Sequence, residues 1–513
     1  MSIGHLLARS ALFHPWSPGV EDARRTVTYG ELAAEVHRLT TGLGTLGVRR
    51  GDRIAVMAKN RIEYVALLFA VADLGAVTVP VNWRLGAGEV EYILRDSGAT
   101  VVVAEPAFAV IIESASALLP DLRHKIGLDE GLPGWTPFAQ MAMATPARHR
   151  SSVTPDDVAI QMYTSGTTGK PKGALLTHRN LTSLTSAWLL DMPLSPRSDR
   201  FLQVTPLYHV GAVLMVMSNV AVGSQLMLLP EFAPGPAAEA LAERGVTKAL
   251  FVPAMIRWLL ADPGVSGQKF PDLGMIAYGA APIPPQLLLD AFDVFDCDLV
   301  QGYGLTETSG VITTLRAEDH HRGDESRLAS AGRAVLCSRV RVVDEEDQEV
   351  APGTIGEIVA QGDNITPGYW NMADASADAL RGGWFHTGDV GWMDDEGYIT
   401  IVDRLKDMIL VGGENVYPSE AEHALDGHPA VVESAVIGIP HDVWGEQLLA
   451  LVVLDDGQSV TDRELIAHCR GQLAQFKCPT LVEFRDTLPR NAAGKLLKAE
   501  LREPYWADRS RRV

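Results

Sequence analysis

The amino-acid sequence predicts an α/β protein with a large N-terminal domain of layered α/β subdomains and a small α+β C-terminal domain. The chain has 513 residues, of which 47% are hydrophobic, and a chain of that length exceeds what one compact core can hold. Helical patterns such as YGELAAEVHRLTTGL alternate with short β-rich runs such as RIAVMA and TVVVAE, and KALFVP and LGMIAYG repeat a strand that ends in Gly or Pro. This alternation predicts layered helices around a mainly parallel sheet.

A different pattern begins near Gly382 and predicts an antiparallel hairpin. The run GWFHTGDVGWMDDEGYITIVDRLKDMI has its turn at Asp394–Gly397, where Asp and Gly residues favour a tight reversal. With the turn centred there, Asp389 lies almost opposite Val402, which brings Asp389 towards Arg404 at the open end of the hairpin.

The segments after this hairpin predict a separate small domain. Ser419 and Glu422 have the spacing of a capping box at the start of a helix, and AVIGIP and LLALVVLDD are typical of strands. We place the boundary close to Arg404–Lys406, which gives a large domain over residues 1–404 and a small domain over residues 405–513.

Composition excludes several functions and predicts a cytoplasmic protein. The formal net charge of −20 disfavours nucleic acid and anionic membranes, whose partners present broad basic surfaces. The four cysteines show no CxxC spacing, which suits a reducing compartment and gives no zinc or disulfide framework. No signal peptide is evident, and the uncharged segment from Phe201 to Pro230 is interrupted by polar residues, so we expect a buried core segment and no stable membrane insertion.

The segment Tyr163–Gly173 has the composition of a phosphate-binding loop. Its sequence, YTSGTTGKPKG, is rich in Thr, Gly and Lys. A Walker A loop needs Ser or Thr directly after Gly-Lys, to hold magnesium. Pro171 follows Gly169-Lys170 here, so that hydroxyl is missing and a continuing helix is disfavoured. The remaining hydroxyls, amides and two cations could surround a leaving pyrophosphate; a solvated linker is the alternative.

Five further motifs, together with this loop, identify a family resemblance. They are QGYGLTET (301–308), HTGDVG (386–391), DRLKDMI (403–409), GGENVYPSE (412–420) and PRNAAGKLLK (489–498). In this order they resemble the adenylate-forming superfamily, which contains acyl-CoA synthetases, beetle luciferases and the adenylation domains of peptide synthetases. The resemblance spans nearly the whole chain.

The resemblance implies a two-step reaction that uses ATP, Mg²⁺ and coenzyme A. A carboxylate attacks the α-phosphate of ATP to give an acyl-adenylate and pyrophosphate, and a thiol then displaces AMP. Two anions must meet, so cations and dipoles must offset their repulsion. Because the carboxylate is already ionised at neutral pH, the first step needs no general base.

The resemblance also implies a role for each motif residue. Glu307 would hold Mg²⁺, Tyr303 would stack on adenine, Asp389 and Arg404 would contact the ribose, and Lys495 would be the catalytic lysine. Each of these residues also has a structural alternative. Glu307 could be a surface carboxylate, Asp389 and Arg404 could form an ordinary surface ion pair, and Lys495 could be an exposed C-terminal lysine. The small domain would be mobile about a hinge at Lys406, with Gly412, Gly413 and Glu414 near the pantetheine arm of CoA. The remaining ATP-binding residues implied are Thr164 (also a catalytic residue), Ser165, Gly166, Thr167, Thr168, Gly169, Lys170, Lys172, Gly279, Ala280, Ala281, Gly302, Gly304 and Thr306.

The segment PLYHVGAVLMV predicts the acid-binding pocket. His209 stands where amino-acid-activating relatives carry an aspartate for the substrate ammonium, so an α-amino acid is disfavoured, and we assign His209 to the active site beside the carboxylate. Gly211 replaces the bulky side chain that hydroxycinnamate ligases often carry there, which favours a longer tail. The pocket residues would be His209, Val210, Gly211, Val213, Met255 and Trp258; plain core packing explains each of the apolar ones equally well.

The leading hypothesis is therefore an acid–CoA ligase for a medium- or long-chain fatty acid or an aryl or cinnamic-type acid. Its partners would be the acid, ATP and CoA, and a homodimer is one possible assembly. The alternatives are an acyl-AMP ligase that loads a carrier protein and a non-catalytic nucleotide-binding homologue. The non-catalytic hypothesis predicts loss of Lys495, Glu307 or the phosphate loop, and the sequence retains all three.

Overall fold

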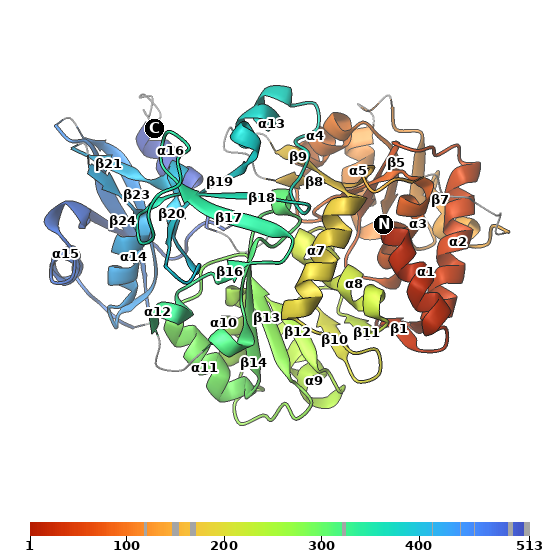
Figure 1. The fold of residues 1–513 in the computed structure, drawn as a ribbon, viewed down its shortest axis with the longest axis horizontal. Coiled ribbons are helices and arrows are strands. Elements are labelled where there is room, and N and C mark those ends of the chain that lie inside the picture. Colours follow the sequence, from red (N-terminus) through yellow and green to blue (C-terminus); the bar gives the residue numbers. More distant parts are fainter. Residues whose placement is uncertain are drawn as a thin grey trace. The chain divides into compact units, whose positions relative to one another are not determined.

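The computed structural model describes residues 1–116, 119, 121–145, 153–164, 171–320, 325–412, 414–441, 443–455, 457–490 and 496–506. The chain divides into two compact units: Met1–Val340 with Ala360–Phe385, and Arg341–Val359 with His386–Val513. Both units mix helices and sheets (Figure 1), which confirms the predicted α/β class. No helix among the described residues is both long enough and apolar enough to span a membrane.

Two large sheets form the framework of the first unit. The nine-stranded sheet has the order β16-β15-β14-β13-β12-β10-β11-β1-β2, and the seven-stranded sheet has the order β7-β6-β5-β3-β4-β8-β9. The strands of the first are β1 (Pro18–Glu21), β2 (Thr26–Thr28), β10 (Arg200–Gln203), β11 (Gln225–Leu228), β12 (Lys248–Phe251), β13 (Met275–Gly279), β14 (Asp298–Tyr303), β15 (Thr313–Leu315) and β16 (Arg333–Ala334). Those of the second are β3 (Arg53–Met57), β4 (Val77–Pro80), β5 (Ala99–Ala104), β6 (His124–Gly127), β7 (Thr136–Pro137), β8 (Val158–Thr164) and β9 (Lys172–Thr177).

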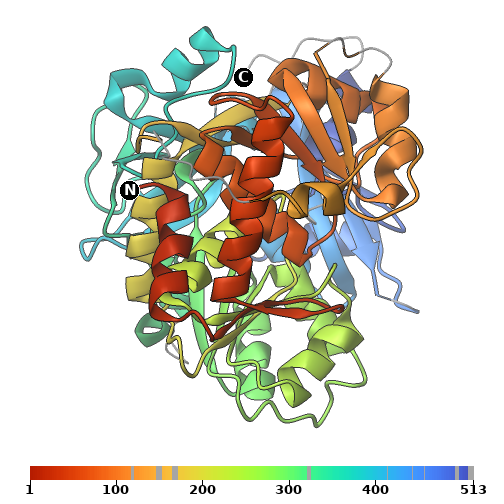
Figure 2. The same ribbon diagram turned by 90° about the vertical axis from the view of Figure 1, so that its right-hand side faces the viewer.

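Helices fill the space between the two sheets and cover their outer faces. The helices of this unit are α1 (Ile3–Phe13), α2 (Tyr29–Thr45), α3 (Ile62–Leu74), α4 (Ala87–Ser97), α5 (Ala109–Ser116), α6 (Phe138–Ala142), α7 (His178–Asp191), α8 (Val210–Val222), α9 (Pro234–Glu243), α10 (Pro253–Ala261), α11 (Pro285–Phe295), α12 (Glu325–Leu328) and α13 (Ala373–Ala379). The central core joins residues of α1, α2, α3, α7 and α8 to both sheets (Figures 1 and 2). Two outer cores hold α9–α11 on one sheet and α4 and α5 on the other.

The alternation of side chains along the strands explains this layering. In β3, Ile54 and Val56 belong to the central core, whereas Ala55 and Met57 belong to the outer core under α4. Successive strand residues point to opposite faces, so a strand that is apolar throughout needs a helical layer on each side. Most neighbouring strands pair in parallel, as the sequence predicted. The segment Phe201–Pro230 forms β10, α8 and β11 and is largely buried, which confirms its assignment to the core.

The remaining strands, most of whose residues belong to the second unit, form two smaller sheets. Their orders are β17-β18-β19-β20 and β22-β21-β24-β23, and β25 pairs with β24. The strands are β17 (Ser338–Val343), β18 (Gly356–Gly362), β19 (Phe385–Met393), β20 (Ile399–Arg404), β21 (Ile409–Val411), β22 (Glu414–Val416), β23 (Val431–His441), β24 (Gly445–Leu454) and β25 (Leu481–Phe484). Helices α14 (Pro418–Asp426) and α15 (Asp462–Arg470) share one apolar core with the five-stranded sheet, and α16 (Lys498–Trp506) contributes to another.

Two details of this unit differ from the sequence prediction. Asp389 pairs with Arg404 and not with Val402, because the turn takes one more residue than expected and a bulge between Val390 and Gly391 adds another. The expected capping box is absent: Ser419 Oγ donates to the carbonyl of Val402 at 2.6 Å, and α14 begins at Pro418 without a side-chain cap.

Candidate active site

The hairpin β8–β9 of the first unit carries the two ends of the phosphate-loop motif. Thr164 pairs with Lys172 across the hairpin, as the last and first residues of their strands. The segment between them, Ser165–Lys170, lies outside the described residues. The Tyr92 hydroxyl donates to the carbonyl of Pro171 at 3.0 Å. Both ends of the loop segment are therefore fixed by the sheet and by α4.

Glu307 lies at these loop ends. It belongs to the short 3₁₀ helix η2 (Thr306–Thr308), and only 7% of its surface is exposed. Its Oε1 accepts hydrogen bonds from the Tyr369 hydroxyl at 2.9 Å and from Thr164 Oγ1 at 3.4 Å. The Lys172 ammonium lies 5.0 Å from the centre of the Tyr369 ring. The structure thus brings together Thr164, Lys172 and Glu307, which are far apart in the sequence.

Sequence reasoning missed Tyr369, which contacts this cluster. Burial, reinforced by the charge of Glu307, raises the pKa of Tyr369 far above its usual range, so the phenol stays protonated and donates to the carboxylate. Tyr369 lies in the GYW segment after β18, which carries no motif signal beyond two adjacent aromatic residues.

The described residues fit a magnesium ion that is shared with a phosphate ligand. No group of three or more His, Cys, Asp or Glu side chains in the described part of the chain could hold a metal. Mg²⁺ bound with nucleotides takes only one or two carboxylates together with phosphate oxygens and water. A single buried carboxylate, Glu307, beside the ends of a phosphate-loop motif has that character.

The small residues predicted beside adenine lie at the ends of β13 and β14. Gly279 pairs with Gly302, and a Cβ atom on Gly279 would lie 2.2 Å from the Gly302 carbonyl oxygen. A Cβ atom on Gly304 would lie 2.6 Å from the Gly310 carbonyl oxygen. Ala280 has a φ of +68°. Close backbone packing therefore requires these glycines. Tyr303 lies between Gly302 and Gly304, at the carboxyl end of β14, an edge where ligands bind in parallel sheets. Ala281 and Thr306 lie in the segments that follow these two strands.

His209 lies at the start of α8, where it is the N-cap residue. Its Nε2 is buried and has no hydrogen-bond partner among the described residues. Burial, helped by the charge of Arg84, lowers its pKa to about 4. The imidazole is therefore neutral at physiological pH and carries an unused polar atom, which a ligand could satisfy.

The other pocket candidates do not share one environment. Val213 is completely buried in the central core, whereas Trp258 is 51% exposed and packs against Phe232. A Cβ atom on Gly211 would lie 3.7 Å from Leu250. The Val210 side chain lies beside Gly310, and Met255 is partly buried against the core under the nine-stranded sheet.

Asn60 fixes the chain just before His209. Its amide donates to the carbonyls of Thr205 and Leu229 at 3.1 Å each, and its Oδ1 accepts from the Leu207 amide at 2.9 Å. Asn60 follows β3 of the seven-stranded sheet, while its partners follow β10 and β11 of the nine-stranded sheet. One buried side chain therefore links the two sheets beside the predicted pocket.

In the second unit, Asp389 and Arg404 form a direct ion pair. Arg404 Nε lies 2.5 Å from Asp389 Oδ1, and the Asp389 side chain is almost completely buried. The backbone amide of Asp389 also donates to Thr387 Oγ1 at 3.0 Å, which holds the main chain at this residue. The proximity that the hairpin predicted is confirmed, with a closer register than expected.

The segment after Arg404 is held by the C-terminal helix. Arg502 in α16 pairs with Asp407 at 2.8 Å and donates to the carbonyl of Lys406 at 3.3 Å. Burial is the largest effect on Lys406 and lowers its pKa. Lys498, also in α16, pairs with the half-buried Glu422 at 2.8 Å. Lys495 lies outside the described residues.

Gly412 and Glu414 flank a turn between β21 and β22. Gly412 has a φ of +60°, and a Cβ atom there would lie 2.8 Å from the Trp444 ring, so glycine is required on two grounds. Glu414 is exposed, and Gly413 lies outside the described residues.

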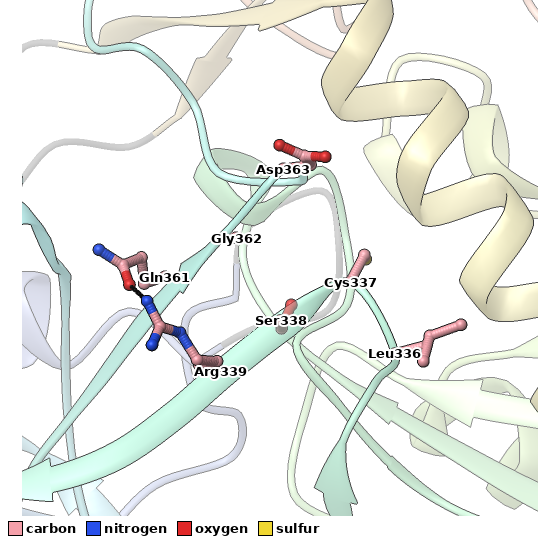
Figure 3. A pocket seen from close by; sticks show the side chains of 7 residues that line it. All are labelled: Leu336, Cys337, Ser338, Arg339, Gln361, Gly362 and Asp363. Atoms are coloured by element: carbon pink, nitrogen blue, oxygen red, sulfur yellow. Dashed lines mark hydrogen bonds between the residues drawn. The ribbon is translucent and has the colours of Figure 1, made fainter.

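An open cavity of about 420 Å³ in the first unit lies apart from these residues. It is lined by Leu336, Cys337, Ser338, Arg339, Gln361, Gly362 and Asp363 (Figure 3). Arg339 donates a hydrogen bond to Gln361 there. Its lining includes none of the predicted site residues.

Comparison with known proteins agrees with the order of the motifs. Residues 7–370 match the model of the AMP-binding enzyme family, and residues 420–495 match that of the AMP-binding enzyme C-terminal domain. The chain is 39% identical to a fatty acid–[acyl-carrier-protein] ligase of Streptomyces coeruleorubidus, over 99% of this chain and 98% of that protein. It is also 39% identical to a feruloyl-CoA synthase of an Amycolatopsis species, over 98% and 99% of the two chains.

A solved structure extends this similarity to the fold. ATP-bound MatB from Rhodopseudomonas palustris superimposes with a TM-score of 0.90 at 31% identity, and the match covers 99% of each chain. The resemblance drawn from the motifs is confirmed. The chain belongs to the AMP-binding enzyme family of the adenylate-forming superfamily.

Proposed function

We propose that the chain is an ATP-dependent acid–CoA ligase that forms AMP. In the first step a carboxylate oxygen attacks the α-phosphorus of ATP, forming an acyl-adenylate and releasing pyrophosphate. In the second step the CoA thiol attacks the acyl carbon, forming a thioester and releasing AMP and a proton. The observation that carries the proposal is the cluster of Thr164, Lys172 and Glu307 at the ends of the phosphate-loop motif, in a chain of the AMP-binding enzyme family.

In the first unit, the side chains around the loop would offset the charge of ATP. Lys172 and the loop residues Thr164–Lys170 would bind the β- and γ-phosphates. Glu307 would hold Mg²⁺ together with phosphate oxygens, and the ion would supply positive charge that screens the two anions from each other. Adenine would stack on Tyr303, beside the strand ends that contain Gly279 and Gly302.

In the second unit, the motif residues would complete the reaction. Asp389 would accept hydrogen bonds from the ribose, with Arg404 supporting it. Lys495 would contact the carboxylate and the α-phosphate during adenylation. Its neighbour Lys498 is already paired with Glu422, which supports Lys495 as the lysine of the motif that acts. Lys406 would be the hinge, and Gly412, Gly413 and Glu414 would approach the pantetheine arm of CoA.

We propose a medium- or long-chain fatty acid or an aryl or cinnamic-type acid as the substrate. The relatives named above act, by their names, on a fatty acid and on a feruloyl group. His209 is neutral and offers no fixed negative charge to a substrate ammonium, which disfavours α-amino acids. Gly211 leaves the space between α8 and Leu250 without a side chain, which suits a long or flat tail.

A pyrophosphate-release assay tests this proposal. The purified chain is incubated with ATP, Mg²⁺ and a panel of acids graded in length and aromaticity, with and without CoA. We expect release with a subset of acids and thioester formation only with CoA. The variant Glu307→Gln should reduce release with every acid by the same large factor. If no acid in the panel causes release by the wild-type chain, the ligase proposal is wrong.

An acyl-AMP ligase that loads a carrier protein is the second candidate. It is favoured by the similarity to the fatty acid–[acyl-carrier-protein] ligase. The net charge of −20 counts against it, because carrier proteins of this kind are acidic and would be repelled. Replacing CoA with a phosphopantetheinylated carrier protein in the same assay separates the two: transfer to the carrier without thioester formation on CoA would favour the second candidate.

A further inference from the structure

We propose that Tyr369 is a positioning residue that orients Glu307 for the magnesium–nucleotide complex. The inference rests on the proposed function, because it assigns Glu307 to Mg²⁺. Tyr369 belongs to none of the six motifs, and its role follows from the contacts that it makes in the first unit.

The hydrogen bond from Tyr369 is the shorter of two that reach Glu307 Oε1. The phenol lies at 2.9 Å and Thr164 Oγ1 at 3.4 Å. A hydrogen bond to one oxygen restricts the rotation of the carboxylate and leaves its other lone pairs free for a cation. Removing a partner that orients a metal-binding carboxylate in this way typically lowers metal affinity by about ten- to a hundred-fold.

The backbone on both sides of this contact is fixed. The Thr366 amide donates to the Glu307 carbonyl at 2.7 Å. Tyr369 bridges to Ala174 of β9, and the Trp370 amide donates to the Gly173 carbonyl at 2.8 Å. The segment that carries Tyr369 therefore continues the β8–β9 hairpin as a further strand-like pairing, and it cannot shift without the loop ends.

Asp96, near the end of α4, binds two residues that adjoin the site, Tyr163 and Trp370. Its carboxylate accepts from the Tyr163 hydroxyl at 2.6 Å, and its carbonyl accepts from Trp370 Nε1 at 2.9 Å. Tyr163 directly precedes Thr164, and Trp370 directly follows Tyr369. Asp96 therefore holds the residues next to Thr164 and Tyr369, the two donors to Glu307. The spacing between these two donors is fixed by their common attachment to α4.

The test measures how tightly the chain holds a metal–nucleotide complex without requiring turnover. Binding of Mn²⁺ in the presence of ATP, with no acid added, is followed by electron paramagnetic resonance. Tyr369→Phe removes the hydroxyl and keeps the ring beside Lys172. We expect the apparent affinity for Mn²⁺ to fall about ten-fold or more, while the melting temperature shows that the variant is folded.

Tyr505→Phe is the matched control. Tyr505 donates to Glu483 at 2.6 Å in the second unit, so its variant removes a tyrosine–glutamate hydrogen bond that does not reach Glu307. We expect its Mn²⁺ affinity to equal that of the wild type. A fall equal to that of Tyr369→Phe would show a general effect on the fold and would overturn the proposal.

A second pair of variants asks whether Tyr369 acts through Glu307. If it does, Tyr369→Phe should add almost nothing in a Glu307→Gln background. Unchanged Mn²⁺ affinity in the single Tyr369→Phe variant, or a full additional loss in the double variant, would overturn the proposal. Failure of the proposed function would give a different result. The wild type would bind Mn²⁺ and ATP, but no acid in the panel would cause it to release pyrophosphate.

Discussion

Protonation of His178 should control how the stability of the first unit depends on pH. His178 begins α7 and is completely buried. Its Nδ1 accepts from the Ile3 amide at 3.2 Å, and its Nε2 has no partner among the described residues. Burial lowers its pKa to about 4, against a small opposing effect of Asp157. His178 therefore binds a proton more weakly in the folded state than in the unfolded chain.

The size of the effect follows from this difference in pKa. With an unfolded pKa of about 6.5, the contribution of His178 to the free energy of unfolding is fully present above that pH and is lost as the pH falls towards 4. The whole difference is worth about 3 kcal/mol, and about 2 kcal/mol of it disappears between pH 7.5 and pH 5. The variant His178→Gln cannot titrate, and its amide oxygen can still accept from Ile3.

Urea unfolding at pH 7.5 and pH 5 measures this contribution. Because the chain has two units, the transitions are fitted with one step for each unit. We expect the wild type to lose about 2 kcal/mol more than His178→Gln between the two pH values, and an exposed-histidine variant, His5→Gln, to behave as the wild type. Equal pH dependence of His178→Gln and the wild type would refute the reasoning.

Three further predictions concern the strand ends, the small unit and Lys495, the proposed catalytic lysine. Gly279→Ala places a Cβ 2.2 Å from the Gly302 carbonyl oxygen, so it should lower the free energy of unfolding by about 1–3 kcal/mol and raise the KM for ATP. The control is Gly274→Ala in the same chain segment, where the nearest atom to the added Cβ is 3.7 Å away. Lys498→Met leaves the half-buried Glu422 without its ion-pair partner and should destabilise the second unit by up to about 3 kcal/mol, measured by urea unfolding, whereas adding Glu422→Gln should recover most of the loss. Lys495→Ala should abolish pyrophosphate release yet largely spare thioester formation from supplied acyl-AMP, and equal loss of both steps would contradict the assignment of Lys495 to the adenylation step alone.

The sequence predicted the regular parts of the fold because they rest on periodicity. Strand and helix patterns placed β3, β5, β12, β13, β23 and β24 in the right segments, since alternation and helical spacing are local properties. The register of the β19–β20 hairpin was wrong by two positions, one from a longer turn and one from a bulge, because a bulge depends on how one strand packs on its neighbour. The capping box at Ser419 was wrong because tertiary partners of Ser419 and Glu422 outcompeted the local motif.

The site was predictable only where a motif named the residue. Glu307 and Thr164 were found from their motifs, and their proximity appeared only in the structure. Tyr369 and Asp96 could not be found, because each contributes a hydrogen bond between segments that are distant in the sequence, 62 residues apart for Tyr369 with Glu307 and 274 for Asp96 with Trp370. A single tyrosine in a loop or a single aspartate near the end of a helix carries no signal of such a partner.

The three hydrogen bonds of Asn60 have a consequence for how selectivity among acids could change. The backbone at Thr205 and Leu207 is attached to the opposite sheet, so it opens to solvent only when the large unit loses its cooperative structure. The amide hydrogen of Leu207 should then exchange with deuterium about as slowly as the slowest amides of that unit. Substrate range beside His209 would therefore vary through side-chain size at positions such as Gly211, while the main chain around it stays constant.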